Sequence, residues 1–121
     1  MITGHVVNLH ALVPLSLRLP NQRDISIEFV LDTGFTGFLT LPLAVVTALN
    51  LSYLEDISAN LATDDQVELP VYAASILWDG VERSVRVLAT GKRPLLGTAL
   101  LADYELVAQF ADNGLVTIDE L

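Results

Sequence analysis

The sequence predicts an all-β, barrel-like domain with one or two short helices. Several short runs alternate apolar and polar residues, which is typical of strands that bury one face. Turn signals such as Asp79-Gly80 stand between these runs at hairpin spacing. A helical spacing of apolar residues follows Pro42. At 121 residues, with no linker or repeat, the chain fits one domain over residues 1–121.

The first strands are expected before residue 32. Residues 1–7 already alternate like a strand, and residues 6–19 are rich in Val and Leu. Because Pro14 interrupts this second run, it fits one bent strand or two short ones. A polar turn over residues 20–24 then closes a hairpin onto a strand at Ile25–Leu31.

A short strand and a helix are expected next. Residues 37–41 indicate a strand, and Pro42 suits the first position of a helix because its φ angle is already helical. Asn50 marks the expected end of this helix. Three apolar residues share one face of it: Leu43, Val46 and Leu49.

The middle of the chain predicts two hairpins. Residues 57–61 and 67–77 are β-prone, and residues 62–66 between them predict an acidic, exposed tip. The Asp-Gly pair at 79–80 is a strong signal for a two-residue turn, which leads into a strand at Val81–Ala89.

The last third of the chain predicts a buried strand and a final hairpin. Leu-Leu-Gly at 95–97 fits a short buried strand that breaks sharply, and Thr98 is expected to cap one or two helical turns through Leu101. Residues 104–110 and 115–118 then indicate two strands, joined by a turn at Asp-Asn-Gly, residues 112–114.

Composition and charge exclude several classes of function. A net charge of −9 with no basic stripe argues against nucleic-acid binding. Residues 33–54 are uncharged and long enough to span a bilayer, but glycine, proline and asparagine divide them, so no membrane segment is expected. There is no cysteine, and His5 and His10 lack a third ligand, so neither metal nor other cofactor is expected. Without a basic, secretory-type start, the chain is expected to be cytoplasmic.

The residues of greatest chemical interest surround Asp32. The strand expected at Ile25–Leu31 ends in Asp32-Thr33-Gly34, so a carboxylate follows a buried strand and adjoins a glycine loop. A charge in a partly desolvated place is costly unless it has a partner or a task. The tripeptide alone favours an ordinary turn in which Asp32 caps its own backbone. The later Leu-Leu-Gly motif, residues 95–97, shifts the balance towards a task.

Together, the motifs resemble those of single-domain aspartic proteases. A strand ending in Asp-Thr-Gly, a second strand, a flap-like hairpin, and two aliphatic residues followed by glycine and a short helix occur in this order over residues 6–118. The order is similar to that of the retropepsin-like group, which includes retroviral proteases and small bacterial homologues. The resemblance implies a closed or partly open barrel of the retropepsin-like acid protease type and an aspartic endopeptidase activity.

The single Asp-Thr-Gly bears on the number of chains. Acid proteolysis needs two nearby carboxylates, one ionised to accept a proton from water and one protonated to polarise the scissile carbonyl. The sequence supplies only one such motif. A working site therefore requires a homodimer in which each copy contributes its catalytic Asp32 and which acts on a peptide or protein substrate. The apolar content of 52% also favours self-association.

The resemblance also implies roles for the residues around Asp32. Thr33 would hydrogen-bond across the twofold axis, and Gly34 would let its backbone approach the carboxylate. Gly97 would follow a strand that packs under the catalytic loop, where a side chain would clash. The hairpin over residues 57–77 would be a flap that closes over a bound peptide. The residues at its tip, expected to meet the substrate, are Thr63, Asp64, Asp65 and Gln66.

Three features depart from the family pattern. Phe35 stands where a small residue or a hydroxyl is usual, so its ring would either narrow the site or turn into the core. The flap tip has no glycine and is acidic, so it should open less readily and disfavour acidic substrates; a simple solvated turn accounts for it equally well. The acidic residues 119–121 of two copies would repel, so the dimer contact is expected to differ from the retroviral one.

Two other functions fit the same residues. The first is a catalytically weak or inactive module that keeps the protease fold to bind an extended peptide or a partner protein; Phe35 and the glycine-free tip favour it. The second is a barrel with a purely structural role, in which Asp32 is only a turn cap. The structural barrel predicts a monomer without a carboxylate pair.

Overall fold

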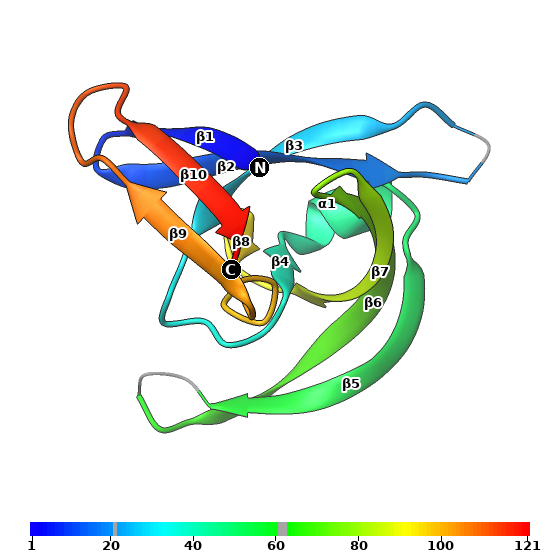
Figure 1. Cartoon of the computed structure of the whole chain (residues 1–121). Helices are drawn as coiled ribbons and strands as arrows, with labels where there is room; N and C mark the ends of the chain where they lie inside the picture. Colours follow the sequence, from blue (N-terminus) through cyan, green and yellow to red (C-terminus); the bar gives the residue numbers. More distant parts are fainter. Residues whose placement is uncertain (21, 61–62) are drawn as a thin grey trace.

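The computed structural model describes residues 1–20, 22–60 and 63–121, and it confirms the predicted all-β architecture. Within these residues, strands form most of the chain and one short helix is present (Figure 1). The elements are β1 (Ile2–Val7), β2 (His10–Arg18), β3 (Ile25–Leu31), β4 (Leu39–Leu41), α1 (Leu43–Ala48), β5 (Ser52–Asn60), β6 (Gln66–Trp78), β7 (Val81–Ala89), β8 (Leu95–Leu96), β9 (Tyr104–Ala108) and β10 (Leu115–Glu120).

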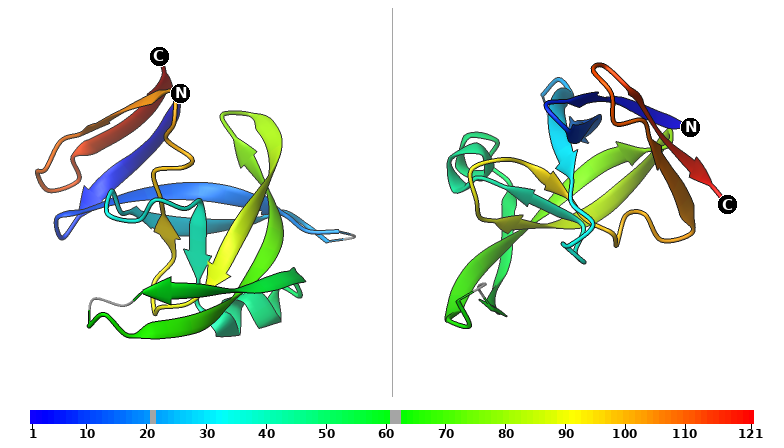
Figure 2. Two further views of the ribbon diagram at one scale, coloured as in Figure 1. Left: turned by 90° about the horizontal axis from the view of Figure 1, so that it is seen from below. Right: turned by 90° about the vertical axis from the view of Figure 1, so that its left-hand side faces the viewer.

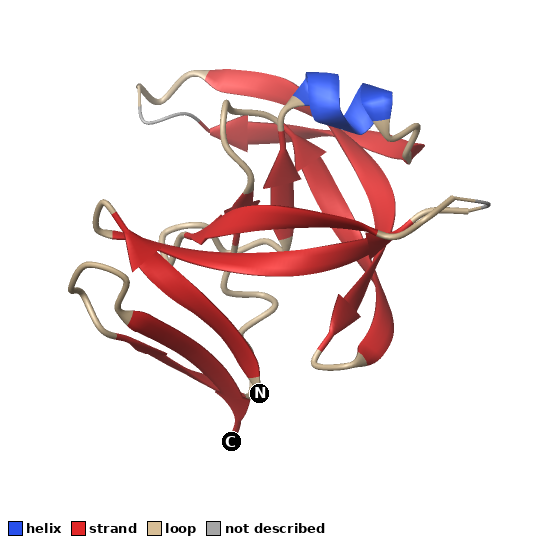
Figure 3. Ribbon diagram, turned by 90° about the horizontal axis from the view of Figure 1, so that it is seen from above, coloured by secondary structure: helices blue, strands red, loops and turns tan. Residues whose placement is uncertain are grey.

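The strands form one curved sheet that partly closes on itself. Their order is β5-β6-β7-β4-β8-β3-β2-β1-β10-β9, and an additional pairing of β6 with β2 joins distant parts of the sheet. Figure 2 shows the resulting shape, with the β5–β6 hairpin extending from one side and the β1, β9 and β10 strands grouped on another. The two chain ends lie beside each other in Figure 3, because Ile2 of β1 pairs with Ile118 of β10. The predicted partly open barrel is confirmed.

Of the two alternatives for residues 6–19, the structure has a single strand that passes through Pro14, and the chain turns before it, at residues 8–9. Asn8 and Leu9 form the turn between β1 and β2, both with positive φ, +49° and +63°. Pro14 lies inside β2, opposite Glu28 of β3. β1 pairs with β2 only as far as Leu12, so at Pro14 the strand has a paired neighbour on one side alone. A proline is tolerated there because the ladder does not need its missing N–H.

The predicted hairpins at the middle of the chain are confirmed, although β5 begins five residues before the expected position 57. Its first residues are exposed on both faces, so no alternation marks them in the sequence. The Asp79-Gly80 turn has positive φ at both residues, as the two-residue hairpin requires. Asn21 of the expected turn at 20–24, and residues 61–62 beside the expected hairpin tip, lie outside the described residues.

The helix forms where expected, but its buried face is narrower than the sequence indicates. Pro42 precedes α1 as its N-cap, and Asn50 ends the region with φ +53°. Only Val46 of the helix is buried, whereas Leu43 is 53% exposed. None of the helices in the described part of the chain is long and apolar enough to cross a membrane.

No second helix forms after β8, and the expected cap at Thr98 is wrong. The segment from residue 98 to 103 consists of turns. Thr98 instead uses its backbone N–H and its hydroxyl to donate to the carbonyl oxygen of Phe35, at 2.9 and 3.4 Å. The final hairpin does form, with β9 ending at Ala108, two residues before the predicted end, and β10 continuing to Glu120.

The core lies between the curved strands, and polar contacts join hairpins at its edge. Fully buried side chains include Phe29, Leu39 and Leu96, which come from the three strands around the centre of the sheet.

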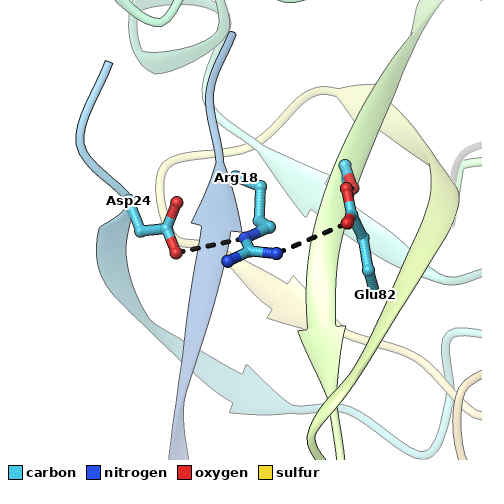
Figure 4. Close-up of polar contacts among 4 residues, drawn as sticks. Arg18, Asp24 and Glu82 are labelled. Carbon is cyan, nitrogen blue, oxygen red and sulfur yellow. Dashed lines mark hydrogen bonds and ion pairs between the residues drawn. The ribbon is translucent and has the colours of Figure 1, made fainter. Parts of the chain in front are cut away.

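At the surface, Arg18 donates to Asp24 and to Glu82, which links the β2–β3 hairpin to β7 (Figure 4). The hydrogen bond to Asp24 raises the pKa of Arg18 above its ordinary value.

Candidate active site

Asp32 lies directly after β3, in a position fixed by backbone pairing. β3 and β8 run parallel, with Leu31 opposite Leu96, and the N–H of Asp32 donates to the carbonyl of Leu96 at 3.0 Å. The Asp32 side chain is half-buried. A buried ladder therefore extends up to the residue that carries the carboxylate, which limits how far that carboxylate moves relative to the core.

The loop after Asp32 orients the carboxylate. The N–H of Gly34 donates to Oδ1 of Asp32 at 2.9 Å, and the N–H of Phe35 donates to the Asp32 carbonyl at 3.1 Å. A Cβ on Gly34 would stand 3.2 Å from the same Oδ1. Glycine thus permits the close approach between this backbone and the carboxylate that the family resemblance implies. The contact alone is equally that of a turn in which Asp32 caps its own backbone.

Gly97 lies beneath this loop. Its N–H donates to the carbonyl of Phe38 at 2.8 Å, and the N–H of Ala99 donates to Gly37 at 3.1 Å. A Cβ on Gly97 would meet the carbonyl oxygens of Gly37 and Phe35 as well as the Phe35 ring. The expected clash at Gly97 is therefore present in the geometry, and the 97–99 segment fixes the Asp-Thr-Gly loop from below.

The Phe35 ring packs against the loop itself. Its atoms lie where a side chain on Gly37 or on Gly97 would stand, 2.6 Å from the position of either Cβ. The side chain is half-buried. The ring thus occupies the space that two glycines leave free. Of the two alternatives for Phe35, this position agrees with a ring that turns inward and not with a ring that narrows the site.

Thr33 and Gly34 are exposed, on the outer side of the loop. Within the described residues, the Thr33 hydroxyl makes no hydrogen bond to another part of the chain. It lines a cavity of about 350 Å³ together with Leu9 of the β1–β2 turn, Leu31, and Phe110 after β9. Sequence reasoning named Thr33 but missed Leu9 and Phe110. A sequence signal was available for Leu9, because it follows Asn8 in a two-residue turn, at a position where glycine is usual.

The expected flap tip is exposed and makes its own local contacts. Thr63 donates to Asp65 at 3.2 Å, and Asp64 has φ +64°. The β5–β6 hairpin and the loop after β3 project to the same side of the molecule (Figures 1 and 2). Among the described residues, no hydrogen bond joins the β5–β6 hairpin to the loop after β3. The structure therefore brings Thr33, Gly34 and Gly97 to Asp32. It does not bring the tip residues there: Thr63, Asp64, Asp65 and Gln66.

The described residues contain no cluster of three or more His, Asp or Glu side chains that could hold a metal ion. His5 and His10 lie on the adjacent strands β1 and β2, and both side chains are exposed. At the site itself, the polar groups are the Asp32 carboxylate, the Thr33 hydroxyl and the backbone groups around them.

The chain is similar to a known protein in three-dimensional structure. No protein-family model matches the sequence, and no curated protein matches it. Among solved structures, the chain is similar to the crystal structure of a retropepsin-like aspartic protease from Rickettsia conorii, with a TM-score of 0.58 and 15% sequence identity. The match covers 99% of this chain and 91% of that chain. At this identity the likeness concerns the fold.

Proposed function

Because the chain has a retropepsin-like fold, we propose that two copies of it form an aspartic endopeptidase. One observation carries the proposal. Asp32 directly follows the buried parallel pairing of β3 with β8, its side chain is half-exposed, and the Gly34 N–H orients its carboxylate. One chain contributes only one such carboxylate, so the second comes from a second copy related by a twofold axis.

The proposed reaction uses one proton shared by the two Asp32 carboxyl groups. Two carboxylates a few ångströms apart do not both ionise easily, so one is protonated over a wide pH range. The ionised group accepts a proton from water while the water oxygen attacks the scissile carbonyl carbon, and the protonated group donates to the carbonyl oxygen. When the tetrahedral intermediate collapses, the C–N bond breaks and a proton passes to the leaving amine. Activity is expected to be highest at acidic to mildly acidic pH.

The surrounding residues serve this reaction by positioning. Thr33 is exposed next to Asp32 with an unused hydroxyl among the described residues, which supports a hydrogen bond to the second copy. Gly97 and the ring of Phe35 hold the loop from below. An extended peptide would bind between the loop and the β5–β6 hairpin, which would act as the flap and exclude water.

Asp32→Asn tests the proposal. This change keeps the size of the side chain and an acceptor for the Gly34 N–H, so the fold and self-association should be preserved. Cleavage of a degenerate peptide library, followed by mass spectrometry, should fall to background. Asp112→Asn is the matched control, because Asp112 is an exposed aspartate in the β9–β10 loop. Unchanged cleavage by the Asp32→Asn protein would rule the mechanism out.

A second function is favoured by the acidic tip, which has no glycine and is exposed. In that alternative the chain keeps the fold to bind an extended peptide or a partner protein without cleaving it. It predicts that peptides which bind the wild-type chain stay intact and bind the Asp32→Asn protein equally well. Hydrolysis that is lost in Asp32→Asn would exclude it.

A further inference from the structure

We propose that the free edge of β5 binds an extended segment of a basic partner protein, with lysine or arginine at alternate positions. β5 is the first strand in the sheet order and pairs with β6 alone, so its other edge has no neighbouring strand among the described residues. It lies along the outside of the molecule (Figure 1). The inference goes beyond the proposed function, because a strand added to this edge lies in the plane of the sheet and not between the β5–β6 hairpin and the Asp-Thr-Gly loop.

A proline in the neighbouring strand shows which backbone groups of β5 point outwards. Asp56 is paired with Pro70 of β6, and proline has no N–H to donate. The two residues therefore form a non-hydrogen-bonded pair, in which the N–H and C=O of Asp56 point away from β6. Because this pattern alternates along the strand, Ser58 has the same orientation. In the described part of the chain no other segment bonds to these groups, so they are available to an added strand.

The side chains beside these backbone groups favour a basic partner. Residues directly opposite each other share a face of the sheet, so Asp56, Ser58 and Glu68 lie on one face. The Ser58 hydroxyl donates to Glu68 at 3.3 Å. Both carboxylates are exposed, and neither forms an ion pair among the described residues. Residues of an added strand that face Asp56 and Ser58 would place alternate side chains on this same face.

An aromatic pair stands beside the first carboxylate. Tyr53 is 57% exposed, and its ring meets the ring of Tyr72 edge to face, with the centroids 5.7 Å apart. The Tyr53 hydroxyl donates to Asp56 at 3.0 Å, so the ring and the carboxylate are adjacent. An aromatic face attracts a cation, and the methylene groups of lysine pack against it. A basic side chain opposite Asp56 would therefore contact both an aromatic ring and a carboxylate.

Charge distinguishes this partner from a second copy of the chain. Residues 52–78 carry five acidic side chains and no Lys or Arg. Among the described residues, Glu55 alone of these five has a cationic partner, Arg86 at 2.8 Å. Two copies that met edge to edge through β5 would bring like charges together, which destabilises a strand pair. A basic segment would instead gain attraction at the same positions.

Binding of a labelled peptide that alternates lysine and valine tests the charge pattern by fluorescence anisotropy. Wild-type and Asp32→Asn proteins should bind it equally, since Asp32 is not part of the edge. The double variant Asp56→Asn, Glu68→Gln should raise Kd about fivefold at low ionic strength, because it removes two exposed charge pairs. The double variant Asp103→Asn, Asp112→Asn removes the same charge from exposed positions outside the hairpin and should change Kd by less than about twofold. Equal effects of the two double variants would overturn the proposal.

Ser58→Pro tests the edge itself, with Ser58→Ala as the matched control. Both variants lose the hydroxyl, but only proline removes the outward N–H and places a ring on the free edge. Ser58→Pro should abolish binding, whereas Ser58→Ala should bind as the wild type does. The melting temperatures of the two should be similar, because the lost N–H is not part of the ladder. Equal binding by the two variants would overturn the edge pairing, and so would a loss of stability confined to Ser58→Pro, which would show that the N–H faces β6.

A peptide of the same composition with its lysines grouped together separates edge pairing from general attraction to an acidic chain. It should bind several-fold more weakly than the alternating peptide, since it cannot place its charges on one face of an added strand. Equal affinity would overturn the proposal and leave the protease proposal intact. Edge binding by a chain that hydrolyses no peptide in the library would support the partner surface and contradict the protease.

Discussion

The ring of Phe35 stands where a side chain on Gly97 would have to be, 2.6 Å from the position of the missing Cβ. The two residues are far apart in sequence, yet the Thr98 N–H donates to the Phe35 carbonyl, so the contact is fixed by backbone as well as by packing. The loop that follows Asp32 is therefore supported by a specific pairing of one large residue with one residue that has no side chain.

Gly97→Ala should destabilise the fold. The added methyl group would meet the carbonyl oxygens of Gly37 and Phe35 in addition to the ring, and backbone cannot give way as a flexible side chain does. We expect the free energy of unfolding to fall by about 2 kcal/mol or more, as overpacking usually costs. Urea denaturation followed by tryptophan fluorescence measures it. Gly97→Ala with wild-type stability would contradict the described loop geometry.

Gly37→Ala should be rescued by a smaller residue at 35, whereas Gly97→Ala should not. The three atoms nearest to a Cβ on Gly37 all belong to the Phe35 ring, so shortening that side chain removes the obstacle. We expect Gly37→Ala to cost about 1–3 kcal/mol in the wild type and much less in a Phe35→Ala background. A double-mutant cycle on the free energy of unfolding gives the coupling. Equal costs in both backgrounds would refute the contact.

These two contacts show where sequence reasoning reaches its limit. Ile25–Leu31 and Val81–Ala89 were predicted with the bounds that the structure has, because alternation and a turn signal act together there. β5 was predicted short because residues 52–56 are exposed, and side chains that bury no face leave no periodic pattern. Pro14 leaves open in the sequence whether residues 6–19 form one bent strand or two short ones, because the sequence does not reveal which neighbours a strand has.

The residues of the candidate site likewise divide into those that local sequence motifs indicate and those that only the fold reveals. Asp32, Gly34 and Gly97 were found from local motifs, and the structure places them together. The direction of the Phe35 ring depends on glycines both near and far in the chain, so no local pattern determines it. Leu9 and Phe110 are about one hundred residues apart in sequence, and only the fold brings them to the cavity beside Thr33.

Gly34→Ala should lower activity with little effect on stability. Its Cβ would lie 3.2 Å from Oδ1 of Asp32, and the carboxylate is at the surface end of the loop, where it has room to shift by a few tenths of an ångström. Because catalysis by a carboxylate pair depends on its placement, we expect kcat to fall about tenfold while the melting temperature stays within a few degrees. A variant with wild-type kcat would show that Gly34 does not position the carboxylate.

Neutralising the hairpin tip should change substrate preference in a salt-dependent way. Asp64 and Asp65 are exposed, and their charges would repel an acidic peptide held beneath the β5–β6 hairpin. The double variant Asp64→Asn, Asp65→Asn should raise kcat/KM for an acidic peptide relative to a neutral one by several-fold at low ionic strength. The gain should shrink near 1 M salt, where the screening length falls to roughly 3 Å. The double variant Asp103→Asn, Asp112→Asn serves as the control, because it removes two charges from exposed positions outside the hairpin. An equal gain in that variant would mean that overall charge, rather than the hairpin tip, sets the preference.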